Sequence, residues 1–370
     1  MIRINSVVGN EKELAQFLYA ELNALGMECR LEEVEPNRPN VYGTLRGEGN
    51  GKKLNFNGHT DTVPVVEGWS SDPFVPHIRN GRIYGLGSSD MKAGIACEMA
   101  MLRAFVESDY AFKGELSFSG VIDEEAHGKG AKAMLQTEFA KVDAIVLAEP
   151  FPGDKSKPIP LGITGKILYN IRVRGKAAHG FQPEFGINAI EELGRILVSL
   201  EQLPFRHHPD FGKGNYSTLK IEGGYGEVYS VVVPASARAE INRLLVPGET
   251  IKTAIIDMEE LIGSLGLSAN VEVGIKPPHY ESFVLDKGEP IFQAFDSAYK
   301  EVMGTAPQYG YTSGITDANI FAGEGGIPCL HFGPPQVVAH QKDEYVSVEW
   351  LATLSKIYAL LALRYFGAIF

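Results

Sequence analysis

The chain has 370 residues, more than a single hydrophobic core usually holds, so two domains are expected before any motif is considered. Hydrophobic residues make up 44% and charged residues 22% of the chain, which excludes a disordered protein. A formal net charge of -12 would repel nucleic-acid phosphates and anionic lipids, so neither nucleic acid nor a membrane is expected as a partner.

The amino terminus has no apolar stretch of the kind found in secretory signals, so the expected location is the cytoplasm. The three cysteines are scattered and odd in number. Neither a disulfide framework nor a thiolate metal site is therefore expected.

The first predicted element is an amphipathic helix. Asn10 and Glu13 have the spacing of a capping box, and apolar residues recur at helical spacing from Leu14 to Leu25 before Gly26. The chain is therefore expected to enter this helix directly after Asn10.

Short β-rich runs that end in polar clusters follow this helix. These runs cover residues 54–57 before GHTD, 115–122 before DEE, and 143–148 before Glu149. Helical patterns lie between them at residues 93–106 and near Ala131. Strands that alternate with helices predict an α/β fold with a mixed sheet flanked by helices, and polar residues just after strands mark the usual site of such sheets.

The pattern changes beyond about residue 161 to long alternating strands at 168–175 and 237–246, with helices at 186–203 and 249–262. These elements predict an inserted α+β domain at residues 163–277. A proline-rich segment around Pro277 then indicates a return to the first domain, which would consist of residues 1–162 and 278–370 and include a helix at 289–302.

Several turns marked by glycine or proline carry imidazole or carboxylate side chains. Those that could bind metal without any thiolate are His59, Asp90, Glu125, Glu149 and His340. Imidazole and carboxylate ligands suit zinc, and cobalt or manganese would also fit. Three carboxylates around two divalent ions leave one net positive charge, which favours a hydroxide bridging two ions over a single-metal site.

The motifs around these positions resemble the M20 metallopeptidases, in the acetylornithine deacetylase and succinyl-diaminopimelate desuccinylase group. The motifs, in chain order, are GHTDTVP (58–64), YGLGSSDMKAG (84–94), DEE (123–125), AEP (148–150) and AHQKDEYV (339–346). One such motif would be a weak signal, but five in order over nearly the whole chain are a strong one.

The resemblance implies a role for each residue. His59 and Glu149 would bind the first metal ion, Glu125 and His340 the second, and Asp90 would bridge the two. Asp61 would fix the tautomer of the His59 imidazole. Glu124 would be the general base that moves a proton from the attacking water to the leaving amine.

The resemblance also gives the inserted domain a role as a lid and dimerisation domain. The segment RGKAAHGFQPEFGINAI (174–190) is similar to the family segment whose histidine, here His179, stabilises the developing oxyanion in a neighbouring subunit. The expected assembly is therefore a homodimer.

Residues that contact the substrate are less well marked. Arg243 is the candidate to pair with a substrate carboxylate, although Ile241 stands where the family often has an acidic residue. Gly314 and Thr316 lie in TSGITDAN (312–319), which resembles the substrate loop but lacks a serine and a second glycine of the desuccinylase version.

The expected function is hydrolysis of the amide bond of an N-acyl amino acid by two zinc ions, a bridging hydroxide and Glu124, with N-acetylornithine as a first substrate to test. A carboxypeptidase or dipeptidase of the same family, acting on short peptides, is the alternative. A third possibility, a binder of amino-acid derivatives without activity, is disfavoured by Glu124, because a binder needs no proton shuttle.

Overall fold

A computed structural model describes residues 1–108, 110–151, 158–225, 231–335 and 338–367. The chain forms two compact units: unit 1 comprises Met1–Ile163 and Val284–Phe370, and unit 2 comprises Thr164–Phe283. Position 277, the predicted end of the insertion, falls inside a strand that runs from Asn270 to Tyr280. The inserted unit therefore ends at Phe283, six residues beyond the end that the prolines around position 277 indicated.

The central sheet of unit 1 carries strands from both ends of the chain. Its strands are β1 (Glu28–Glu35), β2 (Arg38–Arg46), β3 (Lys52–His59), β6 (Gly114–Val121), β7 (Ala144–Leu147) and β17 (Cys329–His331). They lie in the order β1-β2-β6-β3-β7-β17. The four strands from β6 to β17 run parallel, whereas β1 and β2 pair antiparallel at one edge. The predicted strands before GHTD, DEE and Glu149 correspond to β3, β6 and β7.

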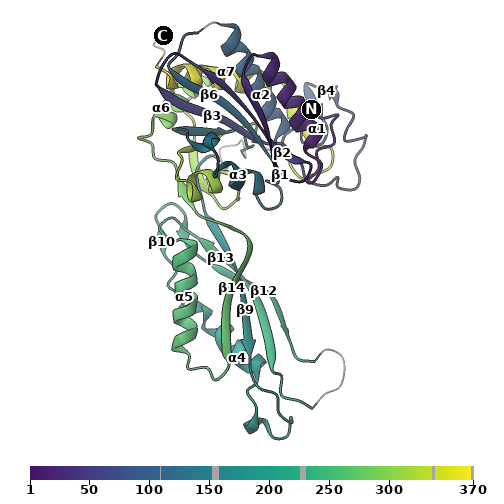
Figure 1. Ribbon diagram of the computed structural model, residues 1–370, viewed down its shortest axis with the longest axis vertical. Coiled ribbons are helices and arrows are strands. Elements are labelled where there is room, and N and C mark those ends of the chain that lie inside the picture. The colour runs from purple at the N-terminus through teal and green to yellow at the C-terminus, as the bar shows by residue number, and fades with distance from the viewer. Residues whose placement is uncertain (109, 152–157, 226–230, 336–337, 368–370) are drawn as a thin grey trace. The chain divides into compact units, whose positions relative to one another are not determined.

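Helices cover both faces of this sheet (Figure 1). They are α1 (Lys12–Ala24), α2 (Lys92–Glu107), α3 (Lys129–Met134), α6 (Pro290–Met303) and α7 (Val348–Tyr365). The ring of Phe56 on β3 meets Tyr358 on α7, with ring centroids 5.5 Å apart. Gly94 lets α2 approach the backbone directly after β7, because a Cβ at position 94 would lie 2.3 Å from the carbonyl oxygen of Ala148. This close approach brings the start of α2 next to Glu149.

The start of α1 differs from the prediction. The helix begins at Lys12 with Glu11 at the N-cap position, and no side chain caps it. Glu11 is buried and its carboxylate accepts hydrogen bonds from Arg38 Nε at 2.9 Å and Arg38 Nη2 at 2.6 Å. The Asn10 capping box is therefore wrong, because a contact distant in sequence determines where this helix begins.

Unit 2 is a four-stranded antiparallel sheet with two helices on one face, drawn in teal and green in Figure 1. The strands are β9 (Gly165–Arg174), β12 (Tyr216–Gly223), β13 (Ser236–Leu245) and β14 (Asn270–Tyr280), in the order β12-β13-β9-β14. The helices are α4 (Ala189–Ser199), capped by Asn188, and α5 (Ile251–Ser264), which has a capping box formed by Thr250 and Thr253. Apolar residues of the sheet and both helices form its own hydrophobic core.

Short elements complete the described part of the chain. The strands are β4 (His77–Arg79), β5 (Arg82–Tyr84), β8 (Ile159–Ile163), β10 (His207–His208), β11 (Gly212–Lys213), β15 (Phe283–Val284), β16 (Tyr309–Thr312) and β18 (Tyr345–Ser347). The short helical turns are η1 (Glu138–Ala140), η2 (Pro183–Phe185), η3 (Leu200–Gln202) and the π-helical turn η4 (Asn319–Glu324).

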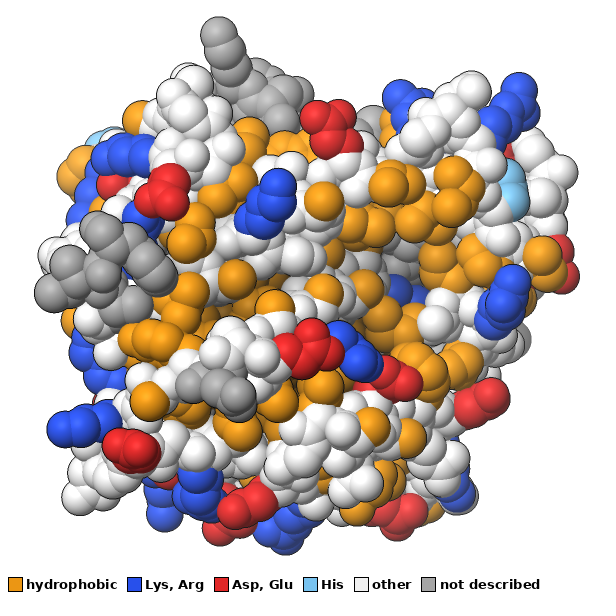
Figure 2. Space-filling model, turned by 90° about the horizontal axis from the view of Figure 1, so that it is seen from above, with side chains coloured by type: hydrophobic (Ala, Val, Ile, Leu, Met, Phe, Trp, Pro, Cys, Tyr) orange, Lys and Arg blue, Asp and Glu red, His pale blue; other side chains and the backbone are white. Residues whose placement is uncertain are grey.

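The predicted fold class is confirmed: a mixed α/β sheet flanked by helices, with a second α+β unit inserted into it. No helix within the described residues is both long and apolar enough to cross a bilayer. On the face shown in Figure 2, acidic and basic side chains are interspersed, so the net negative charge is not gathered there into one patch.

Candidate metal centre

The carboxyl ends of the parallel strands in unit 1 bring together residues from five separate stretches of chain. His59 is the last residue of β3, Glu125 follows β6, and Glu149 follows β7. Asp90 precedes α2, and His340 lies in the segment before β18. Ligands in open α/β sheets bind at this edge, because the strand ends and the turns that follow them converge there.

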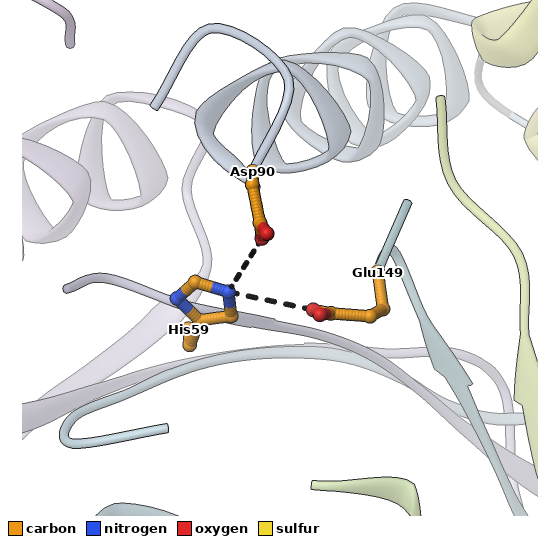
Figure 3. A group of neighbouring side chains, drawn as sticks. All are labelled: His59, Asp90 and Glu149. Atoms are coloured by element: carbon orange, nitrogen blue, oxygen red, sulfur yellow. Dashed lines mark hydrogen bonds and ion pairs between the residues drawn. The ribbon is translucent and has the colours of Figure 1, made fainter. Parts of the chain in front are cut away.

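Three buried side chains form the first group, which Figure 3 shows. His59 Nε2 lies 3.1 Å from Asp90 Oδ1 and 3.4 Å from Glu149 Oε2. One ligand atom from each of the three residues lies within 4.8 Å of the others. The imidazole nitrogen and both carboxylates thus face a common point, as a metal site requires.

The second group shares Asp90 with the first. His340 Nε2 lies 2.9 Å from Glu125 Oε1 and 3.2 Å from Asp90 Oδ2. The two oxygens of Asp90 are therefore divided, with Oδ1 toward His59 and Oδ2 toward His340. This division is the geometry that a carboxylate bridging two ions would need.

The donor set fits two divalent cations. It contains two imidazoles and three carboxylates without a thiolate, which suits zinc and similar ions. Glu149 Oε2 is buried and accepts no hydrogen bond of ordinary geometry, although it lies 3.4 Å from His59 Nε2. A buried carboxylate oxygen without a donor is costly unless a cation neutralises it, so this atom supports a metal at the first group.

The electrostatics of the metal-free groups point the same way. Burial lowers the pKa of His59, but the carboxylates of Glu149, Asp61 and Asp90 more than offset it and leave the pKa well above its usual value. Hydrogen bonds that His340 donates to the Asp90 and Glu125 carboxylates raise the pKa of His340 to about 10. Burial, and then the charge of Asp90, raise the pKa of Glu149 to about 7. Metal ions bind the deprotonated forms of these groups, so they would compete with protons for the same side chains.

Asp61 is positioned differently from the sequence-based expectation. His59 Nδ1 lies 3.0 Å from the backbone carbonyl of Asp61, whereas the Asp61 carboxylate oxygen lies 3.6 Å from that nitrogen, outside hydrogen-bond distance. The carboxylate instead accepts the backbone N–H groups of Glu124 at 3.2 Å and Glu125 at 3.0 Å. Asp61 therefore fixes the imidazole through its backbone and holds the DEE turn through its side chain.

Glu124 belongs to neither group that contains Asp90, but one of its carboxylate oxygens and ligand atoms of His59 and Glu125 all lie within 4.8 Å of one another. Burial and the negative charge of Glu149 raise the pKa of Glu124 well above its ordinary value. The preceding Asp123 has a positive φ of 71° and accepts a hydrogen bond from Arg38 Nη2 at 2.8 Å. The turn that presents Glu124 is therefore fixed from both sides, by Asp61 and by Arg38.

The structure contradicts the substrate role predicted for Arg243. Its side chain is fully buried in unit 2, and Nη2 lies 2.8 Å from both Glu249 Oε1 and Asp257 Oδ2. Alternate residues of β13 face the core beneath α4 and α5, so Arg243 lies on the same side as Ile241 and Leu245. Its guanidinium is occupied by internal carboxylates and is not available to a substrate.

The remaining predicted residues belong to none of these groups. Gly314 is exposed, and its N–H donates to Thr312 Oγ1 at 3.2 Å. Thr316 is buried, and its hydroxyl accepts the N–H of Ala318 at 3.2 Å. His179 is exposed in unit 2. Nothing in these contacts tests the roles predicted for the three residues.

Two acidic residues near the centre were missed by the sequence analysis. Asp317 follows Thr316, is buried, and has an Oδ2 atom that accepts no hydrogen bond. Glu344 lies within the AHQKDEYV motif and accepts three backbone N–H groups from the segment that carries Asp90. A carboxylate inside a recognised motif was the available signal, but no local pattern shows which distant backbone groups it binds.

The sequence model of peptidase family M20/M25/M40 matches residues 55–364. The protein therefore belongs to this family, and it is a metal-dependent hydrolase. Among curated relatives, a succinyl-diaminopimelate desuccinylase from Thioalkalivibrio sulfidiphilus is 28% identical over 97% of this chain and 95% of its own length. Another from Bradyrhizobium sp. is 31% identical over 89% of this chain and 86% of its own.

Solved structures share the fold over nearly the whole chain. An aminopeptidase from Bacillus cereus has a TM-score of 0.77 at 21% identity, covering 99% of this chain and 96% of its own. An M20 family metallo-carboxypeptidase from Sulfolobus solfataricus has a TM-score of 0.75 at 17% identity, covering 99% and 98%. A dinuclear metal-binding peptidase of the family from Bacillus subtilis has a TM-score of 0.74 at 18% identity, covering 100% and 97%. Identities this low establish the fold alone.

Proposed function

We propose that this protein uses two zinc ions to hydrolyse the amide bond of an N-acyl amino acid. The observation that carries this proposal is the division of the Asp90 oxygens between His59 and His340. His59, Asp90 and Glu149 would hold one ion, and Asp90, Glu125 and His340 the other. When bound, such a pair of ions polarises the scissile carbonyl and makes water more acidic, a role that cobalt or manganese could also fill.

Glu124 is the proposed general base. It takes a proton from the attacking water and delivers it to the nitrogen of the leaving amino acid, so that the amide C–N bond breaks as the amine becomes neutral. The raised pKa of Glu124 supports this role, because burial and neighbouring carboxylates make it a better proton acceptor than an exposed glutamate. Asp61 and Arg38 support the role by fixing the turn on which Glu124 stands.

His179 is proposed as the donor that stabilises the oxyanion. The backbone N–H of Phe181 donates to His179 Nδ1 at 3.2 Å, so in the neutral ring the proton is on Nε2. The exposed Nε2–H is then free to donate to a carbonyl oxygen as negative charge develops on it.

The assembly is proposed to be a homodimer formed through unit 2. The strand β12 is at the edge of its sheet, and its Leu219 and Ile221 side chains are 61% and 57% exposed. An exposed edge strand with apolar side chains favours pairing with a second copy. A partner subunit would then supply His179 to the centre of its neighbour.

A substrate screen of the zinc-loaded protein tests the function. The panel should hold N-acetyl and N-succinyl amino acids, including N-acetylornithine and N-succinyl-diaminopimelate, beside blocked dipeptides and short peptides with free amino termini. We expect release of the free amino acid from an N-acyl amino acid at the highest kcat/KM. A higher kcat/KM on the peptides would favour the alternative, a carboxypeptidase or dipeptidase. A carboxypeptidase and a dipeptidase are among the proteins with a similar fold.

A further inference from the structure

The segment that carries the shared ligand Asp90 has no regular structure of its own. It runs from Gly85 to Met91, between β5 and α2, and both Gly85 and Gly87 have positive φ angles, of 151° and 74°. Its backbone N–H groups make no helical or sheet hydrogen bonds at Gly87, Ser89 and Asp90. Contacts from elsewhere in the chain must therefore fix where Asp90 stands.

One carboxylate supplies those contacts. Glu344 Oε1 accepts the N–H groups of Ser89 at 2.6 Å and Asp90 at 3.0 Å, and Oε2 accepts that of Gly87 at 2.8 Å. The backbone carbonyl of Glu344 also accepts the N–H of Gly85 at 3.0 Å. Glu344 is only 2% exposed, so water does not compete for these bonds.

The segment that provides Glu344 also provides the metal ligand His340. His340 and Asp343 both adopt positive φ angles, of 58° and 57°. Asp343 anchors the segment by accepting the Ser70 N–H and hydroxyl, each at 2.8 Å. One stretch of chain thus presents His340 to Asp90 Oδ2 and bonds the backbone of Asp90 at the same time.

We propose that Glu344 is a positioning residue that sets the bridging geometry of Asp90, an inference that rests on the proposed metal centre. A displacement of the Asp90 backbone would disturb both of its oxygen contacts, and so the affinity for both ions. A carboxylate suits this task because it offers acceptor sites to three converging N–H groups, and bonds to a charged acceptor are stronger than neutral ones. Outer partners of metal ligands commonly contribute about 10- to 100-fold to metal affinity.

The variants Glu344→Gln and Glu344→Ala separate this role from general stability. Glutamine keeps one acceptor oxygen for Ser89 and Asp90 but turns an amide toward the N–H of Gly87, whereas alanine removes every acceptor. Glu249→Gln is the matched control, because Glu249 is equally buried and accepts the Val246 N–H at 3.0 Å, but in unit 2. The readouts are zinc affinity by chelator competition, the absorption spectrum of the Co²⁺-loaded protein, and the melting temperature.

We expect zinc affinity to fall by about 10- to 100-fold in Glu344→Ala and by less in Glu344→Gln, with an altered Co²⁺ spectrum in both. Glu249→Gln should melt at a lower temperature yet bind zinc as the wild type does. Unchanged zinc affinity and an unchanged Co²⁺ spectrum in folded Glu344→Gln would overturn the inference, as would an equal loss of affinity in Glu249→Gln. A wild-type chain that binds no zinc would instead overturn the proposed metal centre itself.

Discussion

The adjacent residues Glu124 and Glu125 in the DEE turn have different contacts and different proposed roles. Glu125 Oε1 faces His340 at 2.9 Å, whereas Glu124 belongs to neither group that shares Asp90. One carboxylate oxygen of Glu124 lies within 4.8 Å of ligand atoms of His59 and Glu125, so Glu124 stands close enough to both groups to reach the reacting water. The two glutamates should therefore respond differently to substitution.

Glu124→Gln should keep both zinc ions and lose about 10²- to 10⁴-fold in kcat, because glutamine cannot accept the proton. Zinc content by elemental analysis and steady-state kinetics on the preferred substrate check this expectation. Glu349→Gln, at an exposed position of α7, is the control for an acid-to-amide change. Normal turnover in Glu124→Gln would remove this residue from the role of base.

Asp61→Asn should lower kcat by about 10- to 100-fold while zinc stays bound. Asparagine retains one acceptor oxygen, so either the Glu124 or the Glu125 N–H loses its partner, and the turn that presents the base loosens. The His59 ring keeps its bond to the Asp61 backbone. Kinetics and metal analysis on the same sample measure both quantities. Loss of zinc with full turnover per remaining ion would contradict the role of Asp61 in holding the turn of Glu124.

Metal ligands are easier to predict from sequence than the residues that support them. His59, Asp90, Glu125, Glu149 and His340 stand in recognisable motifs, and the structure brings their side chains together in two groups that share Asp90, while a third group joins His59 and Glu125 with Glu124. The supporting contacts of Asp61 and Glu344 are made to backbone N–H groups, which any residue type offers, so no pattern marks them. The role of Arg243 was also wrongly predicted. The strand β13 alternates buried and partly buried residues, and the sequence does not show that Arg243 lies on the buried face.

At the scale of elements, α2 links the fold to the site. Asp90 stands two residues before the start of the helix at Lys92, and Gly94 brings the helix against the backbone of Ala148. Further along the same helix Glu98 is fully buried, and no hydrogen bond of ordinary geometry reaches either of its oxygens. Burial raises the pKa of Glu98 well above its ordinary value of 4.5, so the folded chain favours the protonated carboxyl more than the unfolded chain does.

Glu98→Gln should therefore stabilise the chain at pH 8 and change its stability little at pH 4. The unfolded chain releases the proton above about pH 4.5, so the contribution of Glu98 is complete below that pH and is lost as the pH rises through its folded-state value. Glutamine never ionises and keeps the shape. Melting temperatures of both proteins from pH 4 to pH 8 test this; a difference independent of pH would contradict a protonated Glu98.

The sequence predicted the positions of elements with strong periodicity well, but it did not predict the start of α1 or the end of unit 2. The strands β3, β6 and β7 and the helix α2 lie within a few residues of the predicted runs. The start of α1 was wrong because Glu11 is held by Arg38, which lies on β2. The end of unit 2 was misplaced because β14 continues through Pro277 and Pro278. Contacts between distant segments decide such boundaries, and local sequence does not contain them.

In the whole molecule, the two units have different proposed roles: unit 1 binds the metal ions, and unit 2 supplies His179 and the dimer contact. Unit 1 holds both groups of candidate ligands, and unit 2 holds the exposed His179 and the exposed edge of β12. Because His179 is exposed on unit 2 and all the candidate metal ligands belong to unit 1, a substitution at His179 should leave those ligands in place. His179→Ala should lower kcat by about 10²-fold and leave zinc content unchanged.

Mixing inactive protomers tests whether the sites are shared. A dimer of one His179→Ala and one Glu124→Ala subunit contains one site with both residues intact if His179 acts in the neighbouring subunit. Refolding or subunit exchange of an equal mixture should then restore up to about a quarter of wild-type activity, because half of the dimers are mixed and each has one intact site. Mixtures as inactive as their parents would show that each subunit uses its own His179.

If Asp90 bridges two metal ions, anomalous diffraction from zinc-soaked crystals will show it. We expect two zinc peaks about 3.5 to 4 Å apart, one beside His59 and Glu149 and one beside Glu125 and His340, with an Asp90 oxygen on each. A single peak, or two peaks without Asp90 between them, would contradict it.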